Sequence, residues 1–405
     1  MRTTTFRDVL LEEIAEIKSG VGFPISMQGC ESGDFPFAKV GDISNRARSG
    51  EQFISDAPNW VKNEDLSTLK FTPFPTGTIV FAKIGEAIRQ NFRAVSTRPM
   101  LFDNNVMGVI PQEERVDTTY LYFYLRTLDF YHLAGKTTVP AIRKSTIEKL
   151  KIPLPPLEEQ RKIAAILDKA DGVRRKRKEA IRLTEELLRS TFLEMFGDPV
   201  TNPKGWRKIS LGELLAEPLQ NGAYFPKERY VEAPDGVEMV HMSDAFYNFV
   251  ERGQLKRVQV TSEEFEKYKL IPNDVLIARR SLNYEGSAKP CLISEADQPL
   301  IFESSLIRVR LNAEVIDSFF FFSYMLEPRA RSAYVFPNVT KSTISGINQA
   351  GLRRISVLVP PMSNQKKYRD IYKKILGTQS NYQKDYENID NLFNSLLQRA
   401  FRGEL

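Results

Sequence analysis

Two long stretches of the chain place apolar residues at spacings of four and three positions in alternation. The first stretch follows Pro156 and contains no proline before Pro199, and the second follows Pro361 and contains none up to residue 405. Spacings of four and three keep side chains on one face of a helix, and over many turns they form the seam of a coiled coil. Each stretch therefore predicts a helix of about 40 residues, or ~60 Å if unbroken.

Both stretches follow one register. The seam positions of the first are 163, 167, 170, 174, 177, 181, 184, 188, 191 and 195, and adding 205 to each gives those of the second. Both seams are apolar at their ends and polar in the middle, so neither is expected to be stable alone. We expect the two helices to pair antiparallel, with the globular units at opposite ends. Two helices packed separately on their own globular units are the alternative.

A Pro-Pro pair precedes each predicted helix. Residues 152–160 read IPLPPLEEQ, and residues 357–365 read VLVPPMSNQ. Consecutive prolines cannot continue a helix or the middle of a strand, so they form a stiff extended joint that ends a globular unit and starts a helix. The first helix is expected to end at Gly197, with Pro199 just behind it.

The chain before each joint is also duplicated. Residues 98–125 align without a gap with 298–325, and TIVFAK (78–83) aligns with DVLIAR (274–279). Short β-rich runs alternate with Gly/Pro turns, and a helical stretch follows near residues 118–128. The most apolar run, FFFFSYML (319–326), is expected to be a buried helix.

These patterns predict an α/β (α+β) fold: a tandem duplication of a globular domain plus a long helix, with the two helices forming an antiparallel coiled coil. The expected boundaries are 1–152 for the first globular domain and 153–198 for the first helix with its joint. Residues 199–357 are expected to form a linker and the second globular domain, and 358–405 the second helix.

Composition adds limited information on partners. The 405 residues include 57 Lys and Arg against 51 Asp and Glu, giving a net charge of +6 and a pI near 9.0. This modest excess fits a nucleic-acid partner, but it also fits many cytosolic proteins. The N-terminal residues are too charged for a secretory signal, and no apolar run approaches the ~20 residues of a membrane span. We expect a soluble, cytoplasmic protein.

Cysteine and histidine give no metal or disulfide pattern. Cys30 and Cys291 are far apart and form no CxxC motif, which favours a reducing compartment. His132 and His241 have no histidine partner four positions away, so packing or hydrogen bonding is the expected role of each.

Motifs for catalysis are also lacking. The sequence contains no NPPF/Y or DPPY tetrapeptide for adenine methylation and no GxGxxG. Gly135-Lys136-Thr137 resembles the end of a phosphate-binding loop, but position 130 is Phe where that motif needs glycine, so we expect a plain loop. The chain is therefore predicted not to be an enzyme and to hold no cofactor or metal.

Several segments together closely resemble the specificity subunit of type I restriction-modification systems. They are IPLPPLEEQRKIAAILDKAD (152–171), FLEMFGDPVTNPKGW (192–206), SLLQRAFRGEL (395–405), KVGDIS (39–44) and GTIVFAK (77–83). The resemblance covers essentially the full chain. One departure is Ser363-Asn364 in place of Glu158-Glu159, which affects only the expectation for the first helical turn.

The resemblance implies two target recognition domains, each reading one half of a split, asymmetric DNA site. It implies spacer helices that set the half-site separation and dock methyltransferase subunits. The implied partners are double-stranded DNA, two DNA adenine methyltransferase subunits that use S-adenosylmethionine, and restriction/translocase subunits that use ATP and Mg²⁺. No membrane partner is implied.

Candidate DNA-contacting residues are polar side chains in turns beside the repeated strands, because such side chains can reach base edges or phosphates. Lys83 and Arg279 stand out, since a basic residue recurs at the end of a matched apolar strand. Asp42 and Asp244 also recur but are expected to form turns. For most candidates a solvated surface position is the alternative. The candidates are Arg46, Arg48, Lys83, Arg89, Asn91, Arg93, Asn104 and Asn105 in the first domain, and Tyr224, Lys227, Arg229, Arg279, Arg280, Asn283, Tyr284 and Lys341 in the second.

The basic run Arg174 to Lys178 allows three interpretations. It can form a solvated helix face, contact the phosphates of spacer DNA, or meet an acidic patch on a methyltransferase. Two of its members fall on the seam, where they are expected to weaken the coil.

Two rival functions remain at the level of sequence. Similar recognition units serve fused nuclease-methylases of type II-like systems, and genome neighbours would discriminate that case. A duplicated coiled-coil scaffold without a DNA role is the other rival, which a gel shift with a methyltransferase subunit would test.

Overall fold

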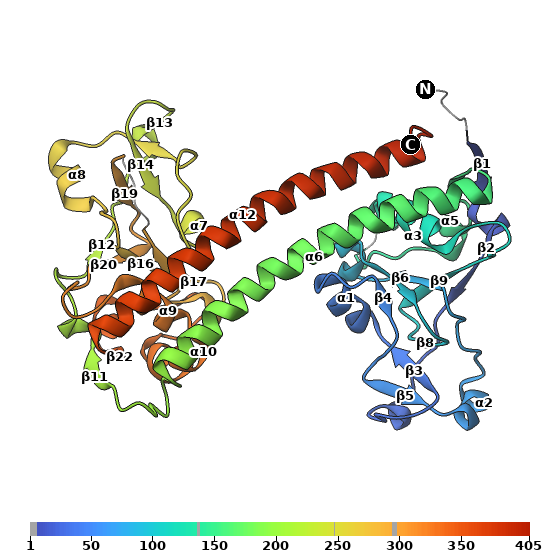
Figure 1. Ribbon diagram of the computed structural model, residues 1–405, viewed down its shortest axis with the longest axis horizontal. Coiled ribbons are helices and arrows are strands. Elements are labelled where there is room, and N and C mark those ends of the chain that lie inside the picture. Colours follow the sequence, from blue (N-terminus) through green and yellow to red (C-terminus); the bar gives the residue numbers. More distant parts are fainter. Residues whose placement is uncertain (1–5, 136–137, 247, 294–297) are drawn as a thin grey trace. The chain divides into compact units, whose positions relative to one another are not determined.

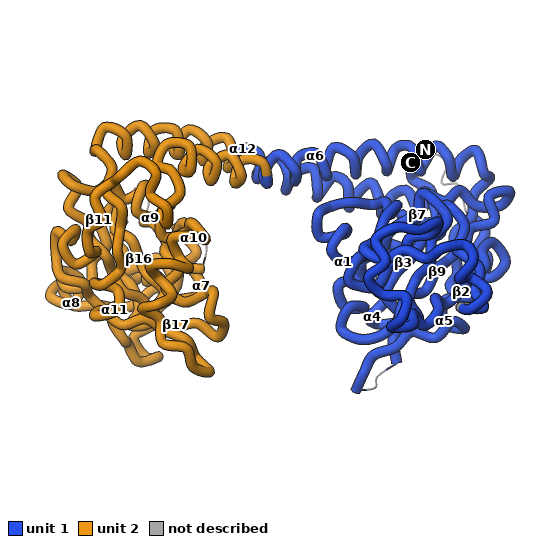
Figure 2. Tube along the Cα trace, turned by 90° about the horizontal axis from the view of Figure 1, so that it is seen from below, with its two compact units in different colours: residues 1–182, 381–405 blue, residues 183–380 orange. Residues whose placement is uncertain are grey.

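The computed structural model describes residues 6–135, 138–246, 248–293 and 298–405 (Figure 1). The chain forms two compact units: unit 1 comprises Met1–Arg182 and Asn381–Leu405, and unit 2 comprises Leu183–Ser380 (Figure 2). Each unit therefore contains one globular domain and one part of each long helix. Of the tripeptide considered above as a phosphate loop, Lys136 and Thr137 lie outside the described residues.

The globular part of unit 1 is built on a five-stranded sheet in the order β2-β9-β6-β7-β4. Its neighbours pair antiparallel except β4 and β7, which pair parallel. A three-stranded sheet, β5-β3-β8, lies beside it, and helices α1 and α3 contact β7. The elements are β2 (Ala15–Ser19), β3 (Phe35–Ala38), α1 (Val40–Arg48), β4 (Phe53–Ile54), β5 (Asn59–Val61), β6 (Ile79–Ala82), β7 (Arg93–Ser96), β8 (Leu101–Phe102), β9 (Val106–Pro111) and α3 (Thr118–Thr127).

Unit 2 repeats this plan with two four-stranded sheets, β12-β20-β16-β18 and β13-β15-β14-β19. Strand β16 pairs with β20 as β6 pairs with β9, and β14 runs parallel to β19 as β3 runs parallel to β8. The tandem duplication predicted from the sequence is confirmed. The elements are β12 (Gln220–Asn221), β13 (Tyr230–Val231), β14 (Val237–Val240), β15 (Arg257–Val258), β16 (Val275–Ala278), β18 (Pro290–Leu292), β19 (Leu300–Phe302) and β20 (Leu306–Val309).

The shorter elements frame these sheets. In unit 1 they are β1 (Arg7–Leu10), α2 (Leu66–Leu69), α4 (Phe130–Leu133), α5 (Lys144–Glu148) and β10 (Lys151–Leu154). In unit 2 they are β11 (Arg207–Ser210), α7 (Met242–Ala245), α8 (Ser262–Tyr268), β17 (Arg280–Ser281), α9 (Ser318–Leu326), α10 (Pro328–Ala330), β21 (Ser345–Gly346), α11 (Gln349–Arg353) and β22 (Ser356–Val359). The apolar run at 319–326 is the buried helix that the sequence predicts.

The two recurring aspartates serve helix starts. The Lys39 amide donates to Asp42 Oδ2 at 2.7 Å, and the His241 amide donates to Asp244 Oδ2 at 2.8 Å. Each carboxylate thereby satisfies a backbone donor at the N-terminus of α1 or α7, where the helix itself offers no acceptor. The sequence predicted turns at these residues, whereas the structure places them in the first turn of a helix.

Each globular domain is closed by its own first and last strands. Strand β1 pairs antiparallel with β10, and β11 pairs antiparallel with β22. The Pro-Pro joint follows β10 and β22 directly, so the chain leaves each domain beside the point where it entered. This geometry delivers the chain from the domain into a long helix: α6 (Leu157–Phe196) in the first repeat and α12 (Met362–Phe401) in the second.

The glutamine that ends the joint motif ties the first helix to its domain through hydrogen bonds of its side-chain amide. We call this set of hydrogen bonds the glutamine lock. Gln160 is 1% exposed, and its Oε1 accepts the Asp117 amide at 2.8 Å. Its Nε2 donates to the carbonyls of Pro155 at 2.8 Å and Arg115 at 3.2 Å. Asp117 in turn caps α3 by accepting the Tyr120 amide. One side chain thus joins the proline joint, the start of α6 and the start of α3.

The second repeat builds the same lock from Gln365, which is fully buried. Its Oε1 accepts the Asp317 amide at 2.8 Å, and its Nε2 donates to the carbonyls of Pro360 at 2.7 Å and Val315 at 3.2 Å. Asp317 caps α9. The Pro-Pro-x-x-x-Gln spacing recurs because only this spacing brings the amide back onto the joint and the cap together.

The two long helices pair antiparallel within each unit. In unit 1, Arg174 Nη1 lies 3.2 Å from Asp390 Oδ1, and Arg177 Nη2 lies 3.3 Å from Asp385 Oδ2. In unit 2, the rings of Phe192 and Phe196 meet Tyr368 edge-on at centroid distances of 5.6 and 5.4 Å.

In both units, later residues of α6 meet earlier residues of α12, which is the antiparallel order predicted from the shared register. Helix α6 ends at Phe196, and Gly197 follows with a φ of 78°, a left-handed conformation that glycine adopts without strain.

The basic run contributes to this pairing in a way that the sequence did not predict. Arg174 and Arg177 occupy seam positions, yet each has a carboxylate partner on α12, and Arg177 also lies over the Tyr382 ring at 4.7 Å. Lys178 Nζ donates to the Arg48 carbonyl at 3.0 Å. The run is therefore largely engaged within the chain, and of its members Lys176 is exposed.

A buried carboxylate in unit 1 forms ion pairs with three guanidinium groups. Asp171 is 1% exposed and lies 2.7 Å from Arg174 Nη2, 3.0 Å from Arg175 Nε and 3.3 Å from Arg126 Nη1. Burial alone raises the pKa of Asp171, but the charges of Arg126, Arg174 and Arg175 outweigh it and lower the pKa below its ordinary value. Asp171 therefore stays ionised and holds α3 to α6.

Removing the glutamine lock should destabilise unit 1. We expect Gln160→Ala to lower the free energy of unfolding by about 2–4 kcal/mol, because it leaves the Asp117 amide and two carbonyls buried without partners. Urea unfolding followed by circular dichroism measures the loss. Gln383→Ala on the exposed face of α12 is the matched control and should change stability by less than about 0.5 kcal/mol. Equal stability of the two variants would contradict the lock.

Neutralising the buried carboxylate should destabilise unit 1 in a pH-dependent manner. We expect Asp171→Asn to cost about 3–5 kcal/mol at pH 7, because three guanidinium groups lose their shared anion. The folded pKa of Asp171 lies below the unfolded value near ~3.9, so its contribution is fully present above about pH 4 and is lost as pH falls through the folded pKa. The stability difference from wild type should shrink below about pH 4. Asp370→Asn, at an exposed carboxylate, should show no such pH-dependent difference.

Candidate nucleic-acid interface

Four loops of unit 2 meet at one end of its sheets. The Ser304 amide donates to the Ala223 carbonyl at 2.8 Å, the Arg279 amide to Ser305 at 2.9 Å, and the Ile347 amide to Arg279 at 3.0 Å. These backbone bonds tie the loops into one continuous surface, which we call the unit 2 loop surface. It comprises residues 222–226, 279–284, 303–305 and 340–347.

Unit 1 carries the same arrangement. The Val21 amide donates to the Phe102 carbonyl at 2.9 Å, the Lys83 amide to Asn105 at 2.9 Å, and the Ile142 amide to Lys83 at 2.8 Å. The unit 1 loop surface comprises residues 20–25, 83–91 and 103–105, together with 138–142. The two surfaces have equivalent backbones because the loops connect equivalent strands.

A glycine is required where the first loop of each surface crosses the neighbouring strand. A Cβ atom at Gly20 would lie 2.3 Å from the Phe102 carbonyl oxygen, and one at Gly222 would lie 2.3 Å from that of Phe302. Both distances are far below van der Waals contact, so only glycine fits. The sequence carries this signal as GVGFP and GAYFP, 202 positions apart, but sequence reasoning missed that repeat.

The unit 2 loop surface presents several of the predicted residues to solvent. Tyr224 is 83% exposed, and Arg280, Asn283 and Lys341 are exposed. Arg279 is half-buried, and its Nη1 donates to the Ser304 carbonyl at 3.3 Å. The exposed groups include two cations and two hydrogen-bonding side chains, the types that reach phosphates and base edges.

Tyr284 supports this surface through contacts with Phe336 and Lys341. Its hydroxyl donates to the Phe336 carbonyl at 3.0 Å, and its ring stacks on that of Phe336 at 4.9 Å. Lys341 Nζ lies over the Tyr284 ring, 5.4 Å from its centre. Tyr284 therefore positions the basic side chain beside it.

The unit 1 loop surface is less basic than predicted. Lys83 is half-buried, and its Nζ donates to Ser19 Oγ at 2.9 Å. Arg89 is exposed but already bonds Glu86 at 3.0 Å and the Tyr131 hydroxyl at 2.6 Å. Asn104 is exposed at the turn before β9, while the neighbouring Asn105 bonds within the turn to Asp103.

Two predicted residues have structural roles instead, and this corrects their assignment as outward-facing groups. Arg93 is 4% exposed, donates to the Leu128 carbonyl at 2.8 Å and lies 3.9 Å from the centre of the Phe130 ring. Asn91 adopts a left-handed φ of 55°, donates to the same carbonyl and accepts the Phe130 amide. Both side chains fix the start of β7 against the end of α3, so neither points outward.

The remaining candidates lie outside the loop surfaces as defined here. On α1, Arg46 pairs with Glu51 at 2.8 Å, and Arg48 donates to Gln90 Oε1 at 2.7 Å. In unit 2, Lys227 is exposed, whereas Arg229 forms a two-point ion pair with Glu264. That pair and the amide of Thr261 hold the pKa of Glu264 at about 2.

Apolar side chains on both surfaces were not anticipated. Leu282 is 87% exposed and Ile344 is 52% exposed on the unit 2 loop surface, and Ile25 (87%) and Val139 (57%) occupy the unit 1 loop surface. Apolar groups beside cations can contact thymine methyl groups or wedge between base steps. A sequence does not show which apolar side chains are exposed, so the candidates predicted from it were polar side chains only.

Among the described residues, no group of three His, Cys, Asp or Glu side chains could hold a metal ion, and no helix could cross a membrane. His132 Nδ1 lies 2.6 Å from Asp129, and His241 bonds the Tyr230 hydroxyl at 2.9 Å. The hydrogen-bonding roles predicted for the histidines are confirmed.

Comparison with known proteins agrees with the geometry. The sequence profile described as the type I restriction modification DNA specificity domain matches residues 4–183 and 203–389. The specificity subunit of the type I restriction enzyme MjaIX from Methanocaldococcus jannaschii is 22% identical over 426 aligned positions, covering 98% of this chain and 92% of that protein.

Two further relatives extend the comparison. The EcoKI specificity subunit of Escherichia coli K12 is 25% identical over 322 aligned positions, covering 74% of this chain and 68% of that protein. The crystal structure of a type I restriction-modification S subunit from M. genitalium superposes with a TM-score of 0.58 at 14% identity, covering 99% of this chain and 97% of that one. At this identity the superposition supports the fold alone.

Proposed function

The chain belongs to the family of type I restriction-modification DNA specificity subunits, non-catalytic components that recognise DNA, and from this premise we propose that its two globular domains each read one half of a split, asymmetric DNA site. A scaffold without a DNA role is no longer an alternative. The proposal rests on one observation: the loop surface occurs once in each unit, on equivalent backbones.

The side chains on the two surfaces differ, which supports an asymmetric site. Lys83 is matched by Arg279 at the strand end, and Asn104-Asn105 is matched by Ser304-Ser305 in the adjacent turn. Asparagine favours adenine, and arginine favours guanine, whereas serine discriminates little. Equivalent loops with different side chains would therefore read different half-site sequences.

The paired helices are proposed to fix the distance between the half-sites. Arg177 on α6 pairs with Asp385 on α12 near the middle of both helices. Each helix is 40 residues long without a break. A two-stranded coil of this length is stiff, so the recognition domains could not change their separation without breaking helix contacts.

The same helices are proposed to dock two DNA adenine methyltransferase subunits. Within unit 1, Ile166 and Val173 on α6 are 45% and 48% exposed, and they lie seven residues apart. This apolar stripe lies outside the seam and would suit a partner helix. The methyltransferase would use S-adenosylmethionine, and the restriction/translocase subunits would use ATP and Mg²⁺, so the chain itself would need no cofactor.

We expect Lys83→Ala and Arg279→Ala each to impair recognition of one half-site only. Each loss should be about 1–3 kcal/mol in binding free energy if the lost contact is to a base. Gel shifts with the methyltransferase subunit present, on duplexes mutated in one half-site at a time, measure the effect. Lys367→Ala, an exposed position on α12, is the charge-matched control. Equal weakening on all sequences would identify these contacts as phosphate contacts and contradict the base-reading role.

Lengthening both helices by one heptad should change the preferred spacer. Insertions after Glu179 and after Lys384 keep the seam in phase and would separate the recognition domains by ~10 Å, or about three base pairs. The change also turns the DNA face by roughly a third of a turn, so affinity should fall even at the new spacing. Selection from a randomised-spacer library reports the preference. An unchanged spacer with retained half-sites would show that the helices do not set the spacing.

A further inference from the structure

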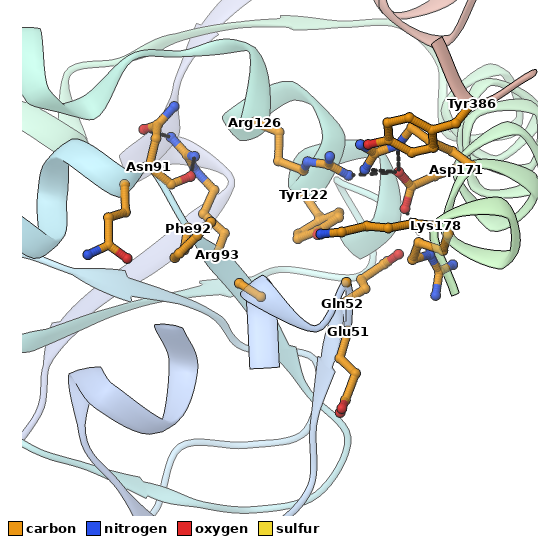
Figure 3. A pocket seen from close by; sticks show the side chains of 15 residues that line it. Glu51, Gln52, Asn91, Phe92, Arg93, Tyr122, Arg126, Asp171, Lys178 and Tyr386 are labelled. Atoms are coloured by element: carbon orange, nitrogen blue, oxygen red, sulfur yellow. Dashed lines mark hydrogen bonds and ion pairs between the residues drawn. The ribbon is translucent and has the colours of Figure 1, made fainter. Parts of the chain in front are cut away.

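A polar pocket of about 340 Å³ lies within unit 1, where the globular domain meets the long helices (Figure 3). One wall comes from the connection between α1 and β4, which includes Glu51 and Gln52, and another comes from Tyr122 on α3. The side facing the helices is formed by Lys178 on α6 and Tyr386 on α12. Its volume falls in the range of sites for small-molecule ligands.

The pocket has an excess of positive charge. Its lining contains five basic side chains and two acidic ones, an excess of three. Glu51 is engaged by Arg46 at 2.8 Å, outside the lining, so Asp171 is the carboxylate left to balance the basic groups. Asp171 is shared among three guanidinium groups, and Asp390 meets a single nitrogen of Arg174. Partly buried cations in such excess favour an anionic ligand.

An unpartnered amide points to the same conclusion. Gln52 is 3% exposed, and neither its Oε1 nor its Nε2 has a hydrogen-bond partner. Buried side-chain amides are normally bonded, and leaving one unpaired is unfavourable. Gln52, Tyr122 and Lys178 lie together around the pocket (Figure 3), so a ligand held by Lys178 would lie beside the amide.

The charged residues that α6 contributes to this pocket have no charged counterparts in the second repeat. The positions 205 residues after Asp171, Arg174, Arg175 and Lys178 are Leu376, Gln379, Ser380 and Gln383, none of which is charged. Leu326 stands 200 positions after Arg126. Unit 2 builds the same glutamine lock and the same helix pairing without this cluster. The charges are therefore not needed to build the repeat.

We propose that this pocket binds phosphate groups at Lys178, Arg175 and the amide of Gln52. Guanidinium and ammonium groups supply the charge-assisted hydrogen bonds that phosphate oxygens accept, and the aromatic rings of Tyr122 and Tyr386 add an apolar wall. The phosphate can belong to a free nucleotide or to the DNA backbone. The site goes beyond half-site reading and does not depend on it.

The test is isothermal titration of the full-length chain with sodium pyrophosphate at constant ionic strength. Lys178→Met removes the ammonium but keeps the apolar stem, and Gln52→Met removes the amide but keeps its length. Lys176→Met is the matched control, since Lys176 belongs to the same basic run but does not line the pocket. We expect the Kd for pyrophosphate to rise at least tenfold in Lys178→Met and Gln52→Met and to stay within twofold in Lys176→Met.

Two further titrations distinguish the sources of the phosphate. Competition by ATP, with duplex affinity equal in Lys178→Met and Lys176→Met, would assign the site to a free nucleotide. A short duplex that loses affinity in Lys178→Met alone, and that pyrophosphate displaces, would assign it to the DNA backbone. If pyrophosphate, ATP and duplex all fail to distinguish Lys178→Met from Lys176→Met, the proposal is overturned. Lys178 is exposed, so this comparison stands even if Gln52→Met folds poorly.

Discussion

A single buried amide in each repeat fixes how a long helix leaves a globular domain. Gln160 and Gln365 each bond a cap residue of the domain, the proline joint and the loop before the cap. Because the amide supplies one acceptor and two donors at fixed geometry, it sets the direction in which the helix starts. A helix extends any error in its starting direction over its full length, so the course of each long helix depends on this short-range contact.

The lock also explains why the two domains can differ while their frame does not. Entry and exit strands pair in both repeats, β1 with β10 and β11 with β22, and the helix starts from that closed base. The loop surfaces connect the other strands and carry none of the lock. Their side chains can therefore vary, as Asn104 and Ser304 do, without altering the packing that positions the helix. The residues that position the helix are thus separate from the loop surfaces, which suits a protein that recognises DNA for a larger system.

The ion pairs between the two long helices also specify how the helices align. Arg174 and Arg177 pair with Asp390 and Asp385, and such ion pairs fit only one register and one direction. Buried or half-buried pairs add little net stability, but they penalise alternative alignments. In unit 2 the helices instead meet through aromatic contacts of Tyr368 with Phe192 and Phe196, each one position beyond the predicted seam positions 191 and 195. The helix contacts within the two units are thus chemically different although the fold repeats.

The sequence by itself determined the repeat, the helices and their antiparallel order, because periodic spacing and proline punctuation are local properties. Only the tertiary structure decided which side chains face outward: Arg93 is a candidate DNA contact in the sequence but is buried against Phe130, while the apolar Leu282 is exposed. It also decided the partners of the basic run, since Asp390 lies 216 positions from Arg174. Burial and long-range pairing depend on the packing of distant segments, and no local pattern in one sequence contains that information.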